Sequence, residues 1–288
     1  MKPAAFEYHR VFDAVEAVQL LEELGDEAKI LAGGQSLTPM MNFRLARPTA
    51  LIDINHCDSL DFIHRDDDVL TIGALTRHRT VEMSTGTKFR DGYEVLPLAA
   101  PHIGHYPIRT RGTFGGSIAH SDPSAEWCVL ARLLDATIVL LGPDGKREVP
   151  AAEWFTGFLT TAIADAEIVL EVRFAQPRQH AALAEFAQRQ GDFAIASAAV
   201  AYDIVDGVCA NTAVVLGAVA SEPFRIAELD QIADGLEPTP DTWRKVAAAA
   251  PEYISPADDL HGDSDYRRRL AKTMIERAFN DAASEKES

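Results

Sequence analysis

The chain has 288 residues, 47% of them hydrophobic, so it can bury a substantial core divided into two or three lobes. A formal net charge of −17 excludes nucleic acids and anionic membrane surfaces as expected partners, because both would repel it. The first residues lack an apolar signal core, and charged side chains interrupt the most apolar stretch, 128–141, so we expect a cytoplasmic protein with no membrane insertion.

The N-terminal part alternates helix and strand signals. Apolar residues at helical spacing predict a helix over 13–24, capped by Asp13 with Glu16 as its capping-box partner and ended by Gly25. A strand over 29–32, a short helix over 40–45 and a buried strand over 51–54 follow. We expect a boundary between two lobes near 55–60.

The middle part contains strand pairs and short helices. Segments 62–63 and 69–73 predict a hairpin around an acidic turn, and 136–141 and 147–149 predict a second hairpin around Pro143-Asp144-Gly145. Segment 167–174 predicts a further strand. Helices are expected over 80–83, 95–100 and 127–134.

From Pro177 the pattern changes to strands followed by helices. Three β-prone segments cover 183–189, 194–204 and 208–217, and Asp206-Gly207 predicts a hairpin between the last two. Helices are expected over 226–233, 242–250 and 265–283. Three antiparallel strands with helices indicate an α+β lobe at the C-terminal end.

The cysteines and histidines do not form a metal-binding pattern. Cys57, Cys128 and Cys209 are far apart and show no C-x-x-C spacing, so this chain alone does not supply the four thiolates of an iron–sulfur cluster. The histidines show no H-E-x-x-H motif. We therefore predict free cysteines in a reducing compartment and no metal ligand.

Two glycine pairs are the strongest functional signals. Ala32-Gly33-Gly34-Gln35-Ser36 follows a predicted strand, and paired glycines let backbone N–H groups approach an anion such as a pyrophosphate. The alternative is a strand-to-helix turn in which the glycines only make the bend. Thr113-Phe114-Gly115-Gly116-Ser117 repeats the pattern, and two such loops suit a dinucleotide. Neither motif matches the Rossmann fingerprint or a P-loop.

Together these motifs resemble one family. Four segments occur in the order seen in FAD-binding medium subunits of molybdenum hydroxylases. They are the first motif extended to Leu37, the second motif with Arg111-Gly112 before it and Asp122-Pro123-Ser124-Ala125-Glu126 after it, Gly191-Asp192-Phe193, and Asp265-Tyr266-Arg267-Arg268. That family includes xanthine dehydrogenase, aerobic carbon monoxide dehydrogenase and quinoline 2-oxidoreductase.

The resemblance implies an α+β fold. It implies a two-lobed FAD-binding domain of the PCMH (vanillyl-alcohol-oxidase-like) type, with sub-lobes over 1–57 and 58–176, and a C-terminal α+β domain over 177–288.

The resemblance also implies which residues bind FAD. The pyrophosphate would be bound by the two glycine motifs, namely by Ala32, Gly33, Gly34, Gln35, Ser36, Thr113, Gly115, Gly116 and Ser117. Glu126 would reach the sugar hydroxyls, although a first-turn acid favoured by the helix dipole is the alternative.

Three further residues are implied at the flavin ring. Asp192 and Phe193 would lie there, with Phe193 in place of the tyrosine that is usual in the carbon monoxide dehydrogenase branch. Where that branch has a lysine, this chain has Glu185, so no lysine role is transferred. Ile163 would pack on the ring or serve in the core.

No residue of this chain resembles a catalytic base or nucleophile, which indicates a flavin module of a larger enzyme. The resemblance implies a large partner subunit with the molybdenum cofactor, a small partner with two [2Fe–2S] clusters, and a dimer of heterotrimers in which FAD passes electrons to an external acceptor. Residues 122–127 favour an N-heteroaromatic substrate such as quinoline or nicotine. The alternatives are a medium subunit of aerobic carbon monoxide dehydrogenase, a stand-alone flavin oxidase, and a scaffold protein that has lost its flavin.

Overall fold

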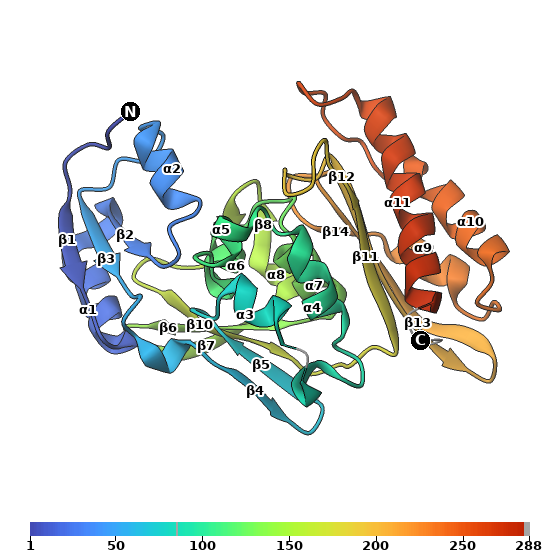
Figure 1. Cartoon of the computed structure of the whole chain (residues 1–288), viewed down its shortest axis with the longest axis horizontal. Coiled ribbons are helices and arrows are strands. Elements are labelled where there is room, and N and C mark those ends of the chain that lie inside the picture. The colour runs from blue at the N-terminus through green and yellow to red at the C-terminus, as the bar shows by residue number, and fades with distance from the viewer. Residues whose placement is uncertain (85, 285–288) are drawn as a thin grey trace.

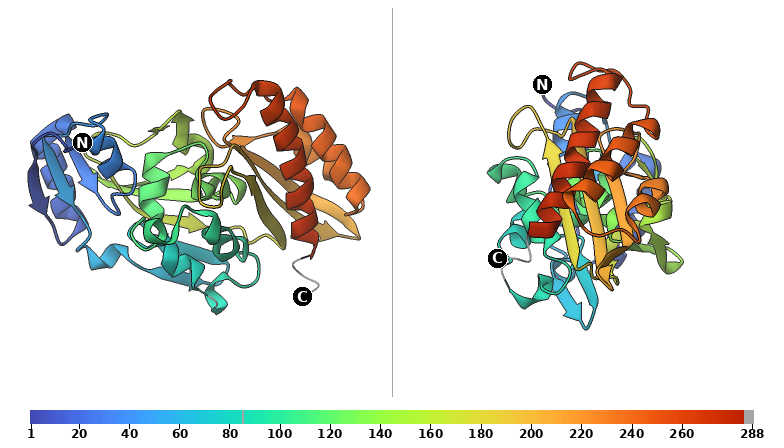
Figure 2. Two further views of the ribbon diagram at one scale, coloured as in Figure 1. Left: turned by 45° about the horizontal axis from the view of Figure 1, so that its top comes forward. Right: turned by 90° about the vertical axis from the view of Figure 1, so that its right-hand side faces the viewer.

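Three β-sheets lie in a row and follow one another in the order of the sequence (Figure 1). The structure is a computed structural model that describes residues 1–84 and 86–284. Figure 2 shows the same row from a second direction and from its C-terminal end, where helix α11 lies in front of the third sheet. Among the described helices, none combines the length and the apolar character needed to cross a bilayer.

The first sheet is parallel and has the order β1-β3-β2. Its strands are β1 (Glu7–Arg10), β2 (Ala28–Leu31) and β3 (Ala50–Asp53), and helices α1 (Ala14–Leu24) and α2 (Leu37–Asn42) provide the crossovers that parallel strands require. The predicted caps of α1 are confirmed, because Asp13 accepts the Glu16 amide at 2.8 Å and Gly25 has a φ of +70°. Helix α2 begins three residues earlier than predicted.

Helix α1 packs the first sheet against the second. Ala17 and Val18 are buried in a core that also contains Val139, Ile168 and Leu170 from the second sheet. Because strands expose alternate residues on opposite faces, the second sheet can contact α1 on one side and a different core on the other.

The second sheet is antiparallel and has the order β4-β5-β10-β6-β7. Its strands are β4 (Ile63–Asp66), β5 (Val69–Gly73), β6 (Thr137–Gly142), β7 (Gly145–Pro150) and β10 (Ile168–Phe174), and both predicted hairpins are confirmed. A two-stranded ribbon of β8 (Phe155–Gly157) and β9 (Thr160–Thr161) lies in the same part of the chain.

Short helices cover the face of the second sheet that is turned away from α1. They are α3 (His78–Glu82), α4 (Val95–Ala99), α5 (Tyr106–Arg109), α6 (Phe114–His120), α7 (Glu126–Leu133) and α8 (Ala151–Trp154). They share one core with the sheet, in which Trp127, Trp154 and Phe114 are almost completely buried.

The third sheet has the order β11-β12-β13-β14 and is antiparallel. Strands β11 (His180–Phe186), β12 (Ala196–Val205) and β13 (Val208–Gly217) correspond to the three predicted strands, and the sheet adds the two-residue strand β14 (Phe224–Arg225). Helices α9 (Ala227–Ala233), α10 (Pro240–Ala249) and α11 (Ser264–Ser284) follow.

Strand β12 is buried on both faces, which explains its nearly continuous apolar sequence. Ala198, Val200 and Tyr202 pack into the core under α9–α11, whereas Ala199 and Ala201 belong to the core of the second sheet. The third sheet is therefore fixed against the middle of the molecule, and its β11–β12 loop is positioned by a rigid strand.

Candidate functional site

A cleft of about 580 Å³ lies at the carboxyl ends of the parallel strands of the first sheet. Leu31 and Asp53 are the last residues of β2 and β3, and both line it. The remaining lining residues are Ala32, Gly33, Gly34, Gln35, Thr38, Pro39, Asn42, Asn55 and Arg111. Ligands of open α/β sheets commonly bind at this edge, and the volume suits part of a nucleotide cofactor.

The first glycine motif connects β2 to α2, and the backbone geometry requires glycine at both of its glycine positions. A Cβ on Gly33 would lie 2.3 Å from the carbonyl oxygen of Arg111, so this position tolerates no side chain. Gly34 has a φ of +69°, a conformation that L-residues rarely adopt. The two glycines therefore do make the strand-to-helix bend that was the alternative interpretation of this motif.

The same motif also supplies free donors. In the part of the chain that the structure describes, no protein group accepts a hydrogen bond from the backbone amides of 33–36, and the Ser36 hydroxyl caps no N–H group of α2. Uncompensated amides at a strand-to-helix junction favour an anion, and these residues fit the pyrophosphate of a dinucleotide.

The second glycine motif differs from the prediction, because it is the first turn of a helix and not a loop. Thr113 is the N-cap of α6, and its hydroxyl accepts the Gly116 amide at 3.1 Å. The amides of Phe114 and Gly115 donate to carbonyl oxygens of 76 and 74, and the Ser117 amide donates to Thr113. Thus the helix itself, and not an open nest of amides, occupies this position, with the partly exposed Ser117 in its first turn.

The two motifs nevertheless meet in space. Gly33 is in direct contact with Arg111 and Gly112, and a Cβ on Gly116 would lie 3.9 Å from that of Ala32. Residues separated by about eighty positions in the sequence thus form one side of the cleft.

Several polar residues of the cleft were not predicted from the sequence. The Asn55 side-chain amide donates to the carbonyl oxygen of Ala32 at 2.7 Å and to Asp53 at 2.6 Å, which ties the ends of β2 and β3 together. Burial acts to raise the pKa of Asp53, but hydrogen bonds from Tyr8 and Asn55 outweigh it and hold that pKa below its usual range. Arg111 adds a cationic side chain to the lining. The sequence signal that could have identified these cleft residues is the group of polar residues that directly follows a buried strand, at its carboxyl end.

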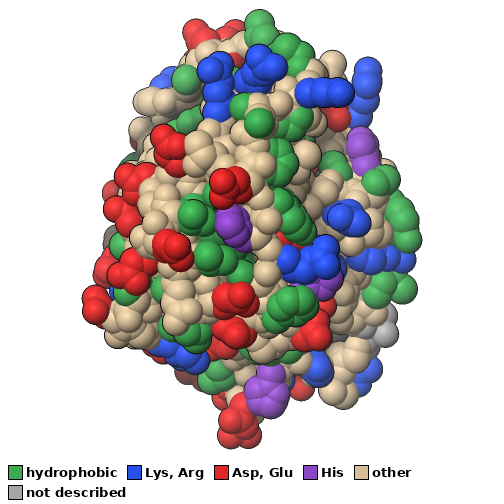
Figure 3. Space-filling model, turned by 90° about the vertical axis from the view of Figure 1, so that its left-hand side faces the viewer, with side chains coloured by type: hydrophobic (Ala, Val, Ile, Leu, Met, Phe, Trp, Pro, Cys, Tyr) green, Lys and Arg blue, Asp and Glu red, His purple; other side chains and the backbone are tan. Residues whose placement is uncertain are grey.

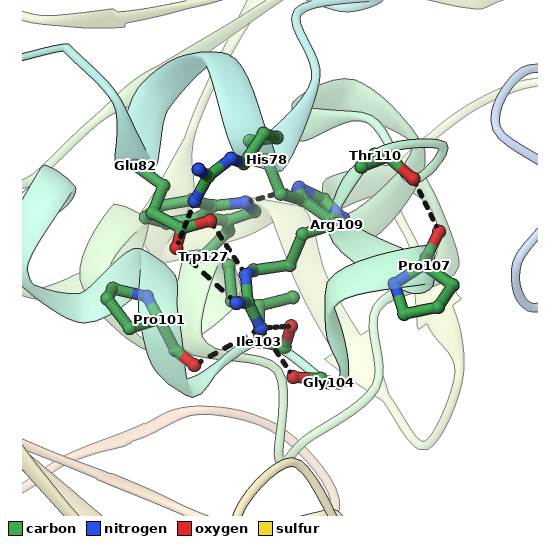
Figure 4. A network of polar contacts seen from close by, with 10 residues as sticks. His78, Glu82, Pro101, Ile103, Gly104, Pro107, Arg109, Thr110 and Trp127 are labelled. Carbon is green, nitrogen blue, oxygen red and sulfur yellow. Dashed lines mark hydrogen bonds and ion pairs between the residues drawn. The ribbon is translucent and has the colours of Figure 1, made fainter.

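A polar network holds the segment that leads into the second motif (Figure 4). Arg109 donates to Glu82 at 2.8 and 3.3 Å and to the carbonyl oxygen of Gly104 at 2.7 Å, while Arg79 pairs with Glu82 at 2.6 Å. These bonds connect α3 and α5, and thereby fix the backbone on which Arg111 lies.

A buried pair connects α3 to α7 in the same view (Figure 4). Trp127 Nε1 donates to His78 Nδ1 at 2.9 Å. Burial, and next the nearby arginines 77 and 109, lower the pKa of His78 to about 3, so the ring stays neutral and can accept this bond.

Glu126 is the first residue of α7, which begins one residue earlier than predicted, and it lies in an acidic environment between the second and third sheets. Burial, and next the carboxylate of Glu185, raise the pKa of Glu126 to about 8. Glu185 belongs to β11, and its Oε1 lies 3.2 Å from His102 Nδ1. Among the described residues, Glu185 Oε2 has no hydrogen-bond partner although it is buried.

The β11–β12 loop brings Phe193 to the outside of the junction between the second and third sheets. Phe193 is 76% exposed, which rules out a role as a core residue in this structure. A Cβ on Gly191 would lie 2.4 Å from His105 Nδ1, so the loop rests on the segment before α5, with Asp192 next to Gly191 in the same loop. Arg267 fixes the base of the loop by donating to the carbonyl oxygen of Ile195 at 2.7 Å.

Ile163 lies in a different environment from Phe193. It is partly buried and packs against the core of the second sheet. This packing is compatible with both roles considered from the sequence.

All three cysteines are free and buried. Burial is the main cause that raises the pKa of Cys57 and of Cys209 to about 11, and it also raises the pKa of Cys128 well above its usual range. Among residues 1–84 and 86–284, no three His, Cys, Asp or Glu side chains are arranged to hold a metal ion.

Comparison with known proteins assigns the family. Residues 4–177 match the family described as FAD binding domain in molybdopterin dehydrogenase, and residues 181–282 match the CO dehydrogenase flavoprotein C-terminal domain. The chain belongs to the FAD-binding medium subunits of the molybdenum hydroxylases. It thus carries an FAD-binding domain of the kind found in the subunits of these oxidoreductase complexes.

Individual relatives of this medium subunit are similar over their full length. The 6-hydroxypseudooxynicotine dehydrogenase complex subunit alpha of Paenarthrobacter nicotinovorans is 37% identical, with 97% of this chain and 95% of that protein covered. A solved carbon monoxide dehydrogenase from Hydrogenophaga pseudoflava is 35% identical with a TM-score of 0.93, and quinoline 2-oxidoreductase from Pseudomonas putida 86 is 32% identical with the same TM-score. Each of these two comparisons covers 99% of both chains.

Proposed function

We propose that this medium subunit binds FAD through the cleft of the first sheet and passes electrons from the [2Fe–2S] clusters of a small partner to an external acceptor. The observation that carries the proposal is the contact between the two glycine motifs, which gathers unpartnered amides and a cationic side chain in one cleft. FAD, when bound, supplies the capacity to take up and release electrons singly or in pairs.

The residues of this chain have separate tasks in that proposal. The amides of 33–36 bind the pyrophosphate, and the second motif adds the hydroxyl of Ser117 and the positive end of its helix dipole. Glu126 accepts hydrogen bonds from sugar hydroxyls. Phe193, together with Asp192, covers one face of the flavin and excludes water from it, while Ile163 supports the neighbouring core.

The proposal includes a division of the chain and an assembly. Residues 1–57 and 58–176 form the two lobes of a PCMH-type FAD-binding domain, and 177–288 form the C-terminal domain; that each segment has a sheet of its own supports this division. With a small iron–sulfur and a large molybdenum subunit it forms a dimer of heterotrimers. Free, buried cysteines support a cytoplasmic location.

The substrate of the complex is proposed to be an N-heteroaromatic compound such as quinoline or nicotine. Two of the similar proteins carry a nicotine-derived compound or quinoline in their names, which supports this class. The substrate itself would bind to the molybdenum subunit, so no residue of this chain is given a catalytic role.

Co-expression tests the proposed function. Produced with its iron–sulfur and molybdenum partners, this chain should co-purify with both and carry about one FAD. The complex should oxidise an N-heteroaromatic substrate, whereas this chain alone should bind FAD and oxidise none. A monomeric chain that oxidises a substrate without partners would contradict the proposal.

Replacing Phe193 tests the assignment of the flavin cover. Phe193→Ala should weaken FAD binding by roughly 1–3 kcal/mol through lost apolar contact and shift the flavin absorption spectrum, because one face would be open to water. The stability of the FAD-free protein should stay nearly unchanged, since Phe193 is exposed. Thermal melts with and without FAD and absorption spectra measure both effects.

Val205→Ala provides the control for Phe193, because Val205 is an exposed apolar residue at the end of β12 that lies away from the β11–β12 loop. Equal destabilisation with and without FAD, together with an unchanged spectrum, would contradict the role of Phe193.

A further inference from the structure

The end of helix α2 presents two large apolar side chains to solvent. Phe43 is 68% exposed and Leu45 is 76% exposed, and they flank Arg44. Arg44, Arg47 and Lys2 are also at least partly exposed. We refer to Lys2, Phe43, Arg44, Leu45 and Arg47 as the α2 tip.

Hydrogen bonds from backbone amides and arginine side chains hold the α2 tip in a defined shape. The Arg44 amide donates to Met41 and the Leu45 amide donates to Met40, both at 2.9 Å. Arg47 Nε donates to the carbonyl oxygen of Arg44 at 3.1 Å, and Arg44 Nε reaches that of Lys2 at 3.4 Å. A preorganised surface loses little conformational entropy on binding, so its apolar side chains can contribute fully to an interface.

The charge of the α2 tip is opposite to that of the chain. Segments 1–6 and 28–52 contain no Asp or Glu, although the whole chain has a net charge of −17. In Figure 3 basic side chains gather along the upper part of this end of the molecule, at the height of α2 and the N-terminus in Figure 1, whereas acidic ones occupy much of the lower and left-hand surface. A local basic surface on an acidic protein selects an acidic partner.

The α2 tip adjoins the cleft. Thr38, Pro39 and Asn42 of the same short helix line it. A partner bound at the tip would therefore be held close to the cofactor-binding part of the molecule.

We propose that the α2 tip docks the iron–sulfur partner subunit, which would offer an acidic surface with an apolar depression for Phe43 and Leu45. This inference rests on the proposed function, because electron donation requires the cluster-bearing subunit to approach the flavoprotein closely. Aromatic and arginine side chains are the types that most often dominate such interfaces. The tip is one anchor of a larger contact, since a stable interface buries more than about 1,000 Å².

Two double variants test the docking. R44E/R47E reverses the charge and F43S/L45S removes the apolar anchors, and the control double variant R269E/L260S changes an exposed arginine of α11 and a fully exposed leucine. The dissociation constant between the FAD-loaded chain and the separately purified iron–sulfur subunit would be measured by calorimetry at low and high salt. Flavin content and melting temperature of each variant would be recorded.

We expect each tip variant to weaken this association by about tenfold or more, with flavin content and melting temperature kept, and R44E/R47E to reduce its salt dependence. The control should bind like the wild type. The proposal would be overturned if both tip variants bound the iron–sulfur subunit with wild-type affinity. It would also be overturned if the tip variants weakened only the binding of the molybdenum subunit, or only the self-association of this chain. Loss of FAD from both tip variants would also overturn it, by assigning the tip to the cofactor cleft.

A failure of the proposed function would look different. A wild-type chain that takes up no FAD, or that binds neither partner, would contradict the function itself and not the location of the docking surface.

Discussion

Gly34→Val should abolish tight FAD binding. A branched side chain at a φ of +69° costs roughly 1–2 kcal/mol of backbone strain, and its Cβ would approach the Thr38 hydroxyl to 2.9 Å and a Leu31 methyl to 3.1 Å. The motif can relieve these contacts only by moving, and the amides of 33–36 would then lose their alignment. Losing two hydrogen bonds to a charged pyrophosphate costs about 3–6 kcal/mol, which corresponds to an affinity at least about a hundredfold lower.

The matched control is Gly207→Val in the β12–β13 turn. Gly207 has a φ of +83° and no atom within 4 Å of its Cβ position, so this variant carries comparable strain far from the cleft. The purified Gly207 variant should be yellow and the Gly34 variant colourless, with both proteins folded by circular dichroism. Stoichiometric flavin in the Gly34 variant would show that this motif does not bind the pyrophosphate.

Glu126→Gln should remove part of the pH dependence of the free energy of unfolding. The pKa of Glu126 is about 8 in the folded protein, against 4.5 for a glutamate free of such burial, so between these values the folded state binds more protons than the unfolded state. The free energy of unfolding therefore falls as pH rises from about 4.5 to 8, by up to about 1.4 kcal/mol per pH unit. Glutamine cannot ionise, so this slope should be absent in the variant.

FAD affinity should show the opposite slope in the wild type. If sugar hydroxyls donate to the ionised carboxylate, binding lowers the pKa of Glu126 and releases a proton, so affinity should increase as pH approaches 8 and then level off. The other titratable groups facing this site, Asp122, Glu185 and His102, remain in the variant and define the background.

Calorimetry for FAD affinity and thermal melts of the FAD-free protein between about pH 5 and 9 measure both slopes. Glu22→Gln on the exposed face of α1 is the control. Identical pH profiles for wild type and Glu126→Gln would contradict a role of Glu126 in FAD binding. They would support the alternative interpretation of the sequence, in which Glu126 is a first-turn acid favoured by the dipole of α7.

Local signals predicted most of the elements of this fold. Asp13 and Gly25 bound α1, and Asp206-Gly207 makes the β12–β13 hairpin, because capping and turn chemistry depend on a few adjacent residues. Strand β14 was not predicted because two residues carry no periodicity, and its pairing with β13 depends on tertiary contacts.

The site was predicted less completely, because it depends on which distant segments meet. The glycine pair after Thr113 predicts a second loop, whereas the Thr113 cap makes it a helix start, and a Cβ on Gly116 would lie 2.6 Å from the Thr113 hydroxyl. Arg111 enters the cleft only because Gly33 permits a close backbone approach, and no local pattern contains that information. For Phe193, exposure could not be distinguished from burial in the sequence.

The three buried thiols affect how well this subunit resists oxidants that its own flavin can produce. Reduced flavins generate peroxide when they meet dioxygen, and peroxide attacks cysteine as the thiolate. With pKa values of about 11 for Cys57 and Cys209, and with the pKa of Cys128 raised well above its usual range, almost no thiolate is present near neutral pH, and none of the side chains is exposed. The flavoprotein should therefore resist oxidative inactivation, and a single cysteine introduced on its surface would be its one readily labelled thiol.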